Sequence, residues 1–365
     1  MKKIGLLGGT FDPIHLTHIQ NAKLAYQQLG LDEVWLIPVL NNPFTKTIVA
    51  TSLQRLDMIK LAIKDEPYIK ICDIELKKDP QLKSYTYDTV KELKTLYDAD
   101  FYFIIGYDQA SKFDLWYKSD ELAKMAKIAI ISRLGYELPS FLNKYHMIEL
   151  KTKATNTSSS AIRQGVHLED LNQDVLKYMM EHSIYTKTMI KSRMSEKRYI
   201  HTLSMTDLAC EFALCNDVDE KKARVAGLLH DVAKEMDKDK MTHIMETHFK
   251  EHLDASFPVW HQWVSSYVAK TEFKIDDPQI IQAIQNHTTG SCNMSKLDMC
   301  IYCADQYDPS RGYDSSKEIE LCKKDIEQGF KQALIDFYEF SKEKNRKVDQ
   351  VFFDIYSKYV LEENK

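Results

Sequence analysis

Two glycines and two histidines near the start of the chain could together bind a phosphate and act on it. The string Gly8-Gly9-Thr10-Phe11 follows a predicted strand, and His15 and His18 stand at the start of a predicted helix. Glycines let the backbone approach a phosphate closely, and a helix start favours anions. The spacing lets both imidazoles face one point, where a protonated ring could neutralise the charge that develops on phosphorus. The alternative is a pair of surface histidines.

Histidines and aspartates also interrupt apolar helices in the second half of the chain. His230 and Asp231 are adjacent within the apolar string 225–234, Asp305 ends a second such string, and His287 ends a third. A buried carboxylate needs a cationic partner, because burying its charge alone is costly. One such residue is more often a hydrogen-bonded core group, but several in one small helical domain favour a site for divalent transition ions.

The first half of the chain alternates short apolar runs with amphipathic stretches. The predicted strands are 4–7, 33–39, 68–73, 100–105 and 126–132, and the clearest helical patterns are 17–28, 52–64 and 86–96. This alternation predicts an α/β domain with a parallel sheet that helices cover on both faces. Ligands of such sheets bind beyond the carboxyl ends of the strands, where the glycines and His15 lie.

From about residue 188 the sequence predicts helices only. They are 199–215, 220–234, 238–251, 264–271, 278–286, 297–305 and 316–343. The polar stretch 186–198 is the expected linker. We therefore expect an α/β domain over residues 1–187 and an all-α domain over residues 188–365.

Two other residue patterns are better explained without a metal. His243, His248 and His252 lie on a strongly polar predicted helix, which indicates a solvated face. Cys300 and Cys303 form a two-thiol motif with no second pair, so we expect them to pack in the core of a helical domain.

The composition is that of an ordinary globular protein with two domains. The chain has 365 residues and a formal net charge of −5, with 44% hydrophobic and 28% charged residues. No apolar run approaches the roughly 20 residues needed to span a bilayer. The mild acidity argues against broad nucleic-acid binding, and seven scattered cysteines favour reduced thiols in a cytoplasm. We therefore expect neither a membrane nor a nucleic acid among the partners.

The first string, taken with Ser158-Ser159-Ser160-Ala161-Ile162-Arg163, resembles the two signatures of the nucleotidylyltransferase superfamily. Within it, residues 1–185 resemble the bacterial nicotinate-mononucleotide adenylyltransferases, with further matching strings at 84–89, 103–108 and 113–117. The resemblance implies a Rossmann-like domain that, with Mg²⁺, transfers the adenylyl group of ATP to nicotinate mononucleotide. Pyrophosphate would be released in this step of NAD biosynthesis.

The resemblance also implies roles for individual residues. His15 and His18 would be catalytic. Thr86 and Trp116 would hold the pyridine ring, with Trp116 stacking on it, as cation–π attraction favours. The residues implied to bind ATP and its phosphates are Gly8, Gly9, Thr10, Phe11, Lys46, Gly106, Asp108, Arg133, Ser158, Ser159 and Arg163.

The order His201, His230-Asp231, Asp305 resembles the HD phosphohydrolase superfamily, and His261 and His287 match its binuclear members. Over roughly residues 196–361 the chain resembles the bacterial HD family that cleaves diadenosine tetraphosphate symmetrically into two ADP. Gln262-Trp263 stand where that family usually has glycine after the third histidine.

This second resemblance implies two divalent transition ions, with iron as the first choice. Asp231 would be catalytic and would bridge the two ions. The implied metal ligands are His201, His230, Asp231, His261, His287 and Asp305. Lys234 and Arg311 are candidates for binding the phosphates of the hydrolase substrate, and ordinary solvated charges are the alternative.

The leading hypothesis is a bifunctional cytoplasmic enzyme, an adenylyltransferase of NAD synthesis joined to a metal-dependent nucleotide phosphohydrolase. One alternative keeps the transferase and makes the HD domain a nucleotide sensor without turnover. Another replaces nicotinate mononucleotide by a different phosphorylated acceptor, such as phosphopantetheine or glycerol phosphate. His15, Thr86 and the segment around Trp116 count against that second alternative.

Overall fold

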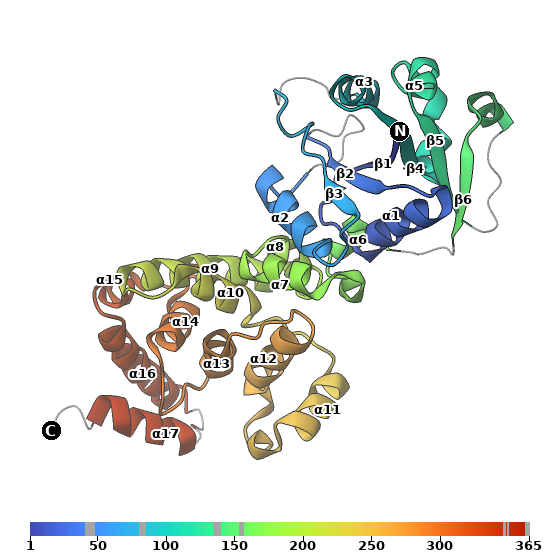
Figure 1. Ribbon diagram of the computed structural model, residues 1–365. Coiled ribbons are helices and arrows are strands. Elements are labelled where there is room, and N and C mark those ends of the chain that lie inside the picture. Colours follow the sequence, from blue (N-terminus) through green and yellow to red (C-terminus); the bar gives the residue numbers. More distant parts are fainter. Residues whose placement is uncertain are drawn as a thin grey trace. The chain divides into compact units, whose positions relative to one another are not determined.

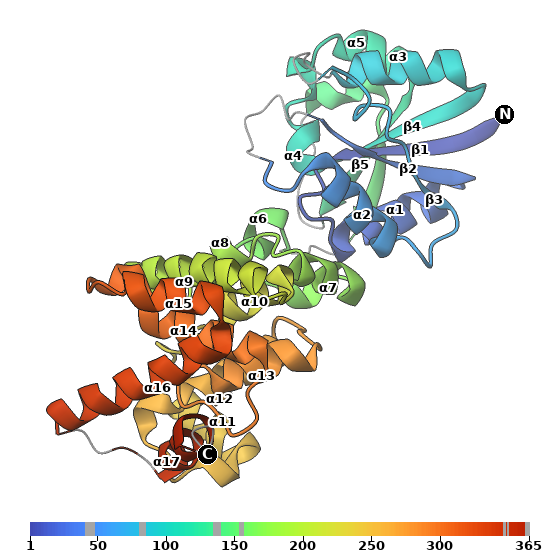
Figure 2. The same ribbon diagram turned by 90° about the vertical axis from the view of Figure 1, so that its left-hand side faces the viewer.

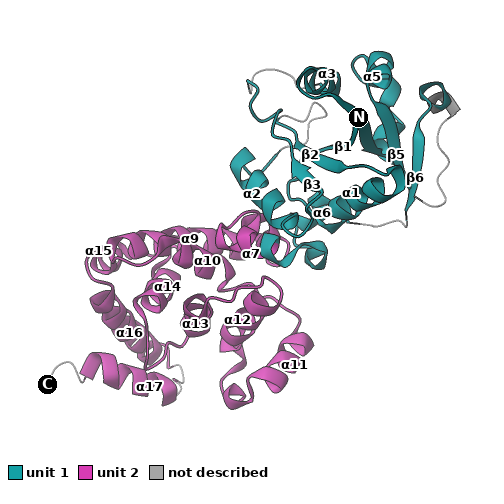
Figure 3. Ribbon diagram, viewed as in Figure 1, with its two compact units in different colours: residues 1–175 teal, residues 176–365 magenta. Residues whose placement is uncertain are grey.

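The protein is described here by a computed structural model that covers residues 1–40, 48–79, 85–133, 140–152, 157–345, 348 and 350–361. Of Arg133 and residues 140–142 it describes the backbone only. The chain divides into two compact units, Met1–Val175 and Leu176–Lys365 (Figure 3).

The first unit is built on a six-stranded sheet in which every neighbouring pair of strands is parallel. The strand order is β3-β2-β1-β4-β5-β6. The strands are β1 (Lys2–Gly9), β2 (Glu33–Pro38), β3 (Ile69–Ile71), β4 (Ala99–Gly106), β5 (Lys127–Arg133) and β6 (Ile148–Thr152). The predicted parallel sheet is confirmed.

Helices cover both faces of this sheet, as predicted. Figures 1 and 2 show α3 and α5 on one face and α1 and α2 on the other. The core beneath α3 and α5 joins Phe101 and Phe103 of β4 to Val90 and Leu93 of α3 and Leu122 of α5. The α-helices are α1 (Leu16–Leu29), α2 (Ser52–Ala62), α3 (Thr86–Leu96), α4 (Tyr107–Ala110), α5 (Ser119–Met125) and α6 (Ser159–Ile162). The 3₁₀ segments of this unit that the structure describes are Phe113–Leu115, Ser140–Tyr145 and Leu168–Asp170.

The strand β6 was not among the predicted strands. It lies at the edge of the sheet and pairs only with β5 among the described strands. Leu150, at its centre, is its only buried residue, and the other four residues are exposed or half-buried. A five-residue edge strand of this kind has no continuous apolar run, which is the signal that revealed the buried strands.

All described elements of the second unit are helical, which confirms the predicted all-α domain. Helix α7 (Gln173–Glu181) leads into it. The others are α8 (Thr186–Lys191), α9 (Glu196–Cys215), α10 (Glu220–Leu229), α11 (Lys238–His248), α12 (His261–Thr271), α13 (Pro278–Asn286), α14 (Lys296–Tyr307), α15 (Ser316–Lys324), α16 (Ile326–Glu343) and α17 (Gln350–Tyr356). Shorter turns occur at Lys250–His252, Phe257–Val259, Pro309–Arg311 and Ser357–Leu361. None of the described helices is long and apolar enough to cross a bilayer.

Helices α9, α10, α13 and α14 form the centre of this unit. Helix α9 packs on α10 and α14, while α13 packs on α10, α12 and α14. The close approach of α9 and α10 depends on Gly227, because a Cβ there would lie 2.8 Å from Thr206 Oγ1 and 3.1 Å from Thr206 Cα. This contact brings the helix that carries His201 against the helix that precedes His230.

Two of the predicted helices are shorter in the structure than the sequence indicates. The helix predicted for 220–234 ends at Leu229, and residues 230–235 form turns. The helix predicted for 316–343 is divided at Asp325, whose extended backbone ends α15 and whose carboxylate caps α16. The stretch 186–198, expected as a linker, contains α8 and the start of α9, since Met189 and Ile190 are buried and Ser195 caps α9.

Candidate active sites

The string predicted to bind phosphate lies at the carboxyl end of β1, in the middle of the sheet. Gly8 and Gly9 end the strand, and Phe11 is fully buried beneath the loop that follows. A Cβ on Gly9 would lie 3.0 Å from the Phe11 ring, so a larger residue here would require the buried ring to shift. The loop therefore presents its backbone, without side chains from the glycines, at the edge of the sheet where ligands of this fold class bind.

His15 and His18 lie together at the start of α1. Their ring centroids are 3.8 Å apart, and the backbone N–H of His15 donates to His18 Nδ1 at 3.2 Å. Because Nδ1 of His18 accepts a hydrogen bond, the proton of the neutral ring is on Nε2. Burial lowers the pKa of His15 to about 4 and lowers the pKa of His18 well below its usual value. In the ligand-free protein both rings are thus neutral N–H donors at pH 7, rather than the protonated rings considered from the sequence.

The second signature reaches the same loop, although it is far away in sequence. Ser159 Oγ donates to the carbonyl of Pro13 at 2.9 Å, and Arg163 Nη1 donates to the carbonyl of Asp12 at 2.6 Å. Ser158 caps α6 by accepting from the N–H of Ala161. Both predicted signatures therefore form one site at the carboxyl edge of the sheet.

A buried arginine that the sequence analysis did not single out supports this loop. Arg55, on α2, is 1% exposed, and its Nη1 donates to the carbonyls of Thr10 and Val39, each at 2.8 Å. Asp12 is equally buried, and its carboxylate accepts the N–H groups of Val49 and Ala50 at 2.9 Å. A charged residue within an otherwise regular helical pattern was the only sequence signal for Arg55.

The residues expected to hold the pyridine ring and the adenylyl group lie on neighbouring elements. Thr86 is the first residue of α3, and Gly106 ends β4 and precedes Asp108 in α4. Trp116 packs against Phe103 and Phe113, with ring centroids 6.0 and 5.4 Å away. Its buried Nε1 makes no hydrogen bond within the described part of the chain. Lys46 lies outside the described residues, as does the side chain of Arg133.

In the second unit, four histidines surround the carboxylate of Asp231, which is 3% exposed. Asp231 Oδ1 lies 3.2 Å from His261 Nε2 and 3.7 Å from His287 Nε2, and Asp231 Oδ2 lies 3.4 Å from His230 Nε2. His201, on α9, completes the cluster. The turn that ends α10 early is what lets the adjacent His230 and Asp231 reach this one point.

The hydrogen bonds of the imidazoles leave their Nε2 atoms as acceptors. Nδ1 of His230, His261 and His287 donates to the backbone carbonyls of Gly227, Pro258 and Ile284 at 2.7, 2.9 and 2.7 Å. A neutral ring with its proton on Nδ1 has a lone pair on Nε2. Nε2 of His261 nevertheless lies 3.1 Å from Nε2 of His287. Lone pairs that face one another around a carboxylate are the donor set of a metal site.

Two groups of three residues have ligand atoms close enough to hold an ion. They are His201, His230 and Asp231, and Asp231, His261 and His287, with the ligand atoms of each group within 4.8 Å of one another. Buried Nε2 of His230 and Oδ1 of Asp231 make no hydrogen bond among the described residues. The cluster therefore fits divalent transition ions, which imidazole and carboxylate bind together.

Asp305 lies beside the cluster but outside these two groups. Its Oδ1 is 2.9 Å from His201 Nε2 and accepts a hydrogen bond from Arg311 Nη2 at 2.5 Å. The neighbouring histidine and arginine hold the pKa of Asp305 well below its usual range, although burial alone would raise it.

Three residues that the sequence analysis did not assign support the histidines. Asp308 is fully buried, and its Oδ2 lies 2.6 Å from His201 Nδ1. Arg198 Nη1 donates to Asp231 Oδ2 at 2.6 Å. Buried Gln262 exchanges hydrogen bonds with Thr289 at 3.0 and 3.2 Å, which ties the start of α12 to the residues after His287. The sequence signals were an acid one turn after Asp305 and an arginine one turn before His201.

The candidates for substrate phosphate lie beside the same cluster. Lys234 Nζ is 3.1 Å from His261 Nδ1, and Arg311 is bonded to Asp305. The other histidines are placed elsewhere. His248 stacks on Tyr267 and His252 stacks on Trp263, with centroids 4.4 and 4.3 Å apart.

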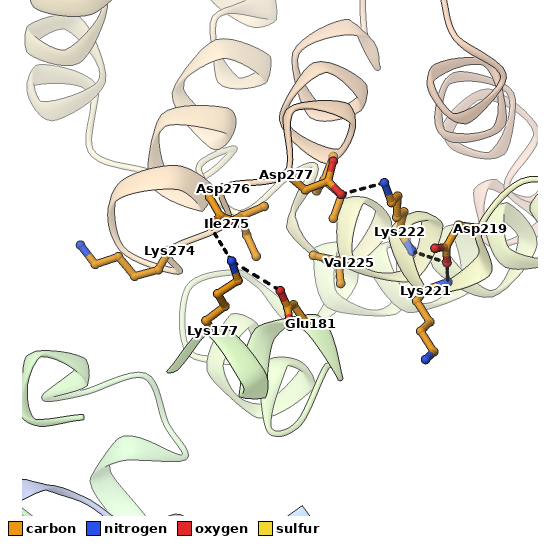
Figure 4. A pocket seen from close by; sticks show the side chains of 11 residues that line it. Lys177, Glu181, Asp219, Lys221, Lys222, Val225, Lys274, Ile275, Asp276 and Asp277 are labelled. Atoms are coloured by element: carbon orange, nitrogen blue, oxygen red, sulfur yellow. Dashed lines mark hydrogen bonds and ion pairs between the residues drawn. The ribbon is translucent and has the colours of Figure 1, made fainter. Parts of the chain in front are cut away.

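Cys300 and Cys303 are buried in the helical core, as expected from the sequence. A cavity of about 210 Å³ in the same unit contains none of the predicted site residues (Figure 4). Two of its four lysines pair with its own acids, with Lys177 Nζ 2.7 Å from Asp276 and Lys222 Nζ 2.8 Å from Asp277.

Comparison with known proteins assigns each unit to a family. Residues 6–165 match the Cytidylyltransferase-like family, and residues 198–310 match the HD domain. A relative from Oceanobacillus iheyensis, named "Probable nicotinate-nucleotide adenylyltransferase", is 37% identical over 191 residues, which are 51% of this chain and 97% of the relative. This chain belongs to the nicotinate-nucleotide adenylyltransferase family. Its second unit contains an HD domain.

Relatives also combine the two parts. A Mycoplasma pneumoniae protein named "Probable nicotinate-nucleotide adenylyltransferase/Ap4A hydrolase" is 29% identical over 341 residues, which are 90% of this chain and 97% of the relative. A crystal structure from Clostridium acetobutylicum, described as an HD superfamily hydrolase involved in NAD metabolism, is 26% identical. It covers 48% of this chain and 96% of its own, with a TM-score of 0.44.

The depressed pKa of His15 predicts a pH-dependent stability of the adenylyltransferase domain. Its pKa of about 4 lies below the ordinary 6.5, so the unfolded chain binds the proton more readily. The contribution of His15 to the free energy of unfolding is therefore fully present above pH 6.5 and is lost as the pH falls toward 4. At pH 5 this loss amounts to about 2 kcal/mol. Urea unfolding at pH 7 and pH 5 measures the change. His15→Asn should reduce the difference in stability between the two pH values, and His167→Asn, at a half-exposed histidine, should not. Equal pH dependence in wild type and His15→Asn would contradict the prediction.

The contact of Asp308 with His201 predicts a weaker metal site in Asp308→Asn. A carboxylate on Nδ1 orients a ligating imidazole and raises its basicity, and losing such a partner costs about 10- to 100-fold in metal affinity. Titration of the metal-free protein with Mn²⁺ or Zn²⁺ measures this. Asp314→Asn, at an exposed aspartate after the same turn, is the control. Unchanged affinity in Asp308→Asn would show that the contact has no role in the site.

Proposed function

We propose that the first domain transfers the adenylyl group of ATP to nicotinate mononucleotide. A phosphate oxygen of the mononucleotide attacks the α-phosphorus of ATP, a new P–O–P link forms, and pyrophosphate leaves. The observation that carries this proposal is the joining of both signatures at one loop, with Ser159 and Arg163 bonded to the backbone that precedes His15 and His18. Membership of the family supports the choice of acceptor.

The residues of the loop would act by positioning and by stabilising charge. The Nε2–H group of His18 would donate to a phosphate oxygen and stabilise the charge that grows there as the bond to pyrophosphate breaks. His15 lies against it, and the glycine backbone would hold the phosphates. Mg²⁺ bound with ATP would screen the phosphate charge. Lys46, Asp108, Arg133 and Ser158 are proposed as further contacts to ATP.

Trp116 and Thr86 are proposed to recognise the acceptor. An electron-poor pyridine ring gains from stacking on indole, and Trp116 lies on the apolar face formed by Phe103 and Phe113. An acceptor without an aromatic ring would not use this contact. Activity with such an acceptor, and none with nicotinate mononucleotide, would favour the alternative acceptors.

We propose that the HD domain hydrolyses diadenosine tetraphosphate symmetrically at a binuclear metal centre, with iron as the first choice of metal. His201, His230, His261, His287 and Asp231 would hold the ions, and Asp305 would complete the first group. Bound ions of this kind supply a reactive hydroxide and stabilise charge on a phosphoryl group. Lys234 and Arg311 would bind the substrate phosphates. The convergence of Nε2 lone pairs on Asp231 carries this proposal.

The functional domains are proposed to be residues 1–187 and 188–365, acting in the cytoplasm on nucleotides and without nucleic acid or membrane partners. The helical segment after Val175 would then include part of the connection between them. A chain that carries both domains would couple NAD synthesis and nucleotide hydrolysis in one polypeptide.

The proposed role of His18 predicts a large loss of turnover in His18→Ala. Removing a donor that stabilises the transition state lowers turnover by about 100-fold or more. Release of pyrophosphate from ATP in the presence of nicotinate mononucleotide measures the rate. His167→Ala is the control at a half-exposed histidine of the same domain. Normal turnover in folded His18→Ala would contradict the role.

The proposed bridging role of Asp231 predicts that Asp231→Ala loses hydrolysis of diadenosine tetraphosphate and keeps adenylyl transfer. Chromatography of products from the wild type should show ADP alone. ATP and AMP as products would contradict symmetrical cleavage. Bound metal with no hydrolysis of any nucleotide in a panel of mononucleotides and dinucleotides would favour the sensor alternative.

A further inference from the structure

The two groups of metal ligands differ in the positive charge that already faces them. We name them the His201 group (His201, His230 and Asp231 Oδ2, with Asp305 beside it) and the His261 group (His261, His287 and Asp231 Oδ1). Asp231 is shared, and each of its oxygens faces one group. An ion that binds to either group must therefore compete with the side chain that already contacts the Asp231 oxygen of that group.

Arginines hold both carboxylates of the His201 group. Arg198 Nη1 donates to Asp231 Oδ2 at 2.6 Å, and Arg311 Nη2 donates at 2.5 Å to the Asp305 oxygen that faces His201. The Asp231 side chain is 3% exposed and the Arg198 side chain is 27% exposed, so this ion pair joins a buried carboxylate to a side chain that still reaches solvent. An arginine cannot give up its charge, and hydrogen bonds between charged partners are the strong ones.

Helix α9 holds Arg198 in this place. The backbone N–H of Arg198 donates to Ser195 Oγ, which caps the helix. The N–H and Oγ of Ser195 both donate to the Glu235 carboxylate, at 2.6 and 2.7 Å. Glu235 follows the turn that carries His230 and Asp231. The contact between Ser195 and the Glu235 carboxylate thus helps to bring Arg198 and Asp231 together, in addition to their own ion pair.

The His261 group has no arginine on its carboxylate oxygen among the described residues. The only cation that the described contacts place there is Lys234, whose Nζ lies 3.1 and 3.2 Å from the ring nitrogens of His261 and 3.3 Å from the carbonyl of Pro258. These partners are neutral and the ammonium is on a flexible stem, so it is displaced more easily than a guanidinium paired with a buried carboxylate. The hydrogen bonds between Gln262 and Thr289 also keep His261 and His287 next to each other.

We propose that the HD domain binds its two ions unequally and in order, first at the His261 group and then at the His201 group. The second ion has to displace Arg198 from Asp231 Oδ2. Arg198 is therefore the resident counter-ion of Asp231 and sets the affinity for the second ion. This inference rests on the metal site of the proposed function and concerns how that site is filled.

Titration of the metal-free full-length protein with Mn²⁺, with free Mn²⁺ counted by electron paramagnetic resonance, tests the order. The wild type should bind two ions with affinities that differ by about tenfold or more, the scale of a hydrogen bond to a charged group. Arg198→Met should strengthen the second step by a similar factor and leave the first unchanged. Arg198→Lys should lie between them. Arg224→Met, which removes ion pairs to Glu220 and Asp207, should titrate like the wild type.

Each outcome of this experiment separates the inference from the proposed function. Two ions of equal affinity in the wild type, or a weaker second ion in Arg198→Met, would overturn the inference and keep the metal site. No bound Mn²⁺ in the wild type would overturn the metal site itself. Should Arg198→Met not fold, ¹⁵N spectra of the wild-type guanidinium groups, assigned with Arg198→Lys, give the answer. The Arg198 signal should change with the second equivalent of Zn²⁺, and a change completed by the first would overturn the order.

Discussion

The arrangement of the helical unit depends on one constraint, which is that the buried carboxylate of Asp231 must be met by positive charge. A lone carboxylate in this environment would cost several kcal/mol, or would take up a proton. Here Arg198 supplies that charge, with its Nη1 2.6 Å from Asp231 Oδ2. The close packing of α9 on α10 at Gly227, the early end of α10 and the contact between Gln262 and Thr289 all serve to place groups around this carboxylate.

In the first unit, buried charged residues fix the conformation of a loop. A phosphate-binding loop has to leave its backbone uncovered and yet remain in one conformation. Glycines uncover the loop, and buried Arg55 and Asp12 fix it through backbone carbonyls and N–H groups on either side. The charged groups of Arg55 and Asp12 bond to the protein backbone. Binding of a ligand is therefore left to His18 and its neighbours. Rigid support beneath an exposed loop is what transition-state stabilisation requires.

Much of this was predictable from the sequence, because local patterns determined it. Five of six strands, the parallel sheet and the all-α second half follow from hydrophobic periodicity, and the site residues stand out as polar groups in apolar strings. The edge strand β6 was missed because only Leu150 is buried in it. The break after Leu229 was missed because no glycine or proline marks it, and the chain turns there to bring His230 and Asp231 to the cluster. Arg198, Asp308 and Gln262 could not be assigned, since their partners lie 33, 107 and 27 residues away.

The proposed chemistry of the helical unit depends most on Asp231, which would be shared by two ions held by different histidines. Anomalous diffraction from crystals of the full-length protein grown with Mn²⁺ tests this directly. The account predicts two anomalous peaks on opposite sides of the Asp231 carboxylate, one bound by His201 and His230 and the other by His261 and His287. A single peak, or strong peaks bound by other residues with none at Asp231, would contradict it.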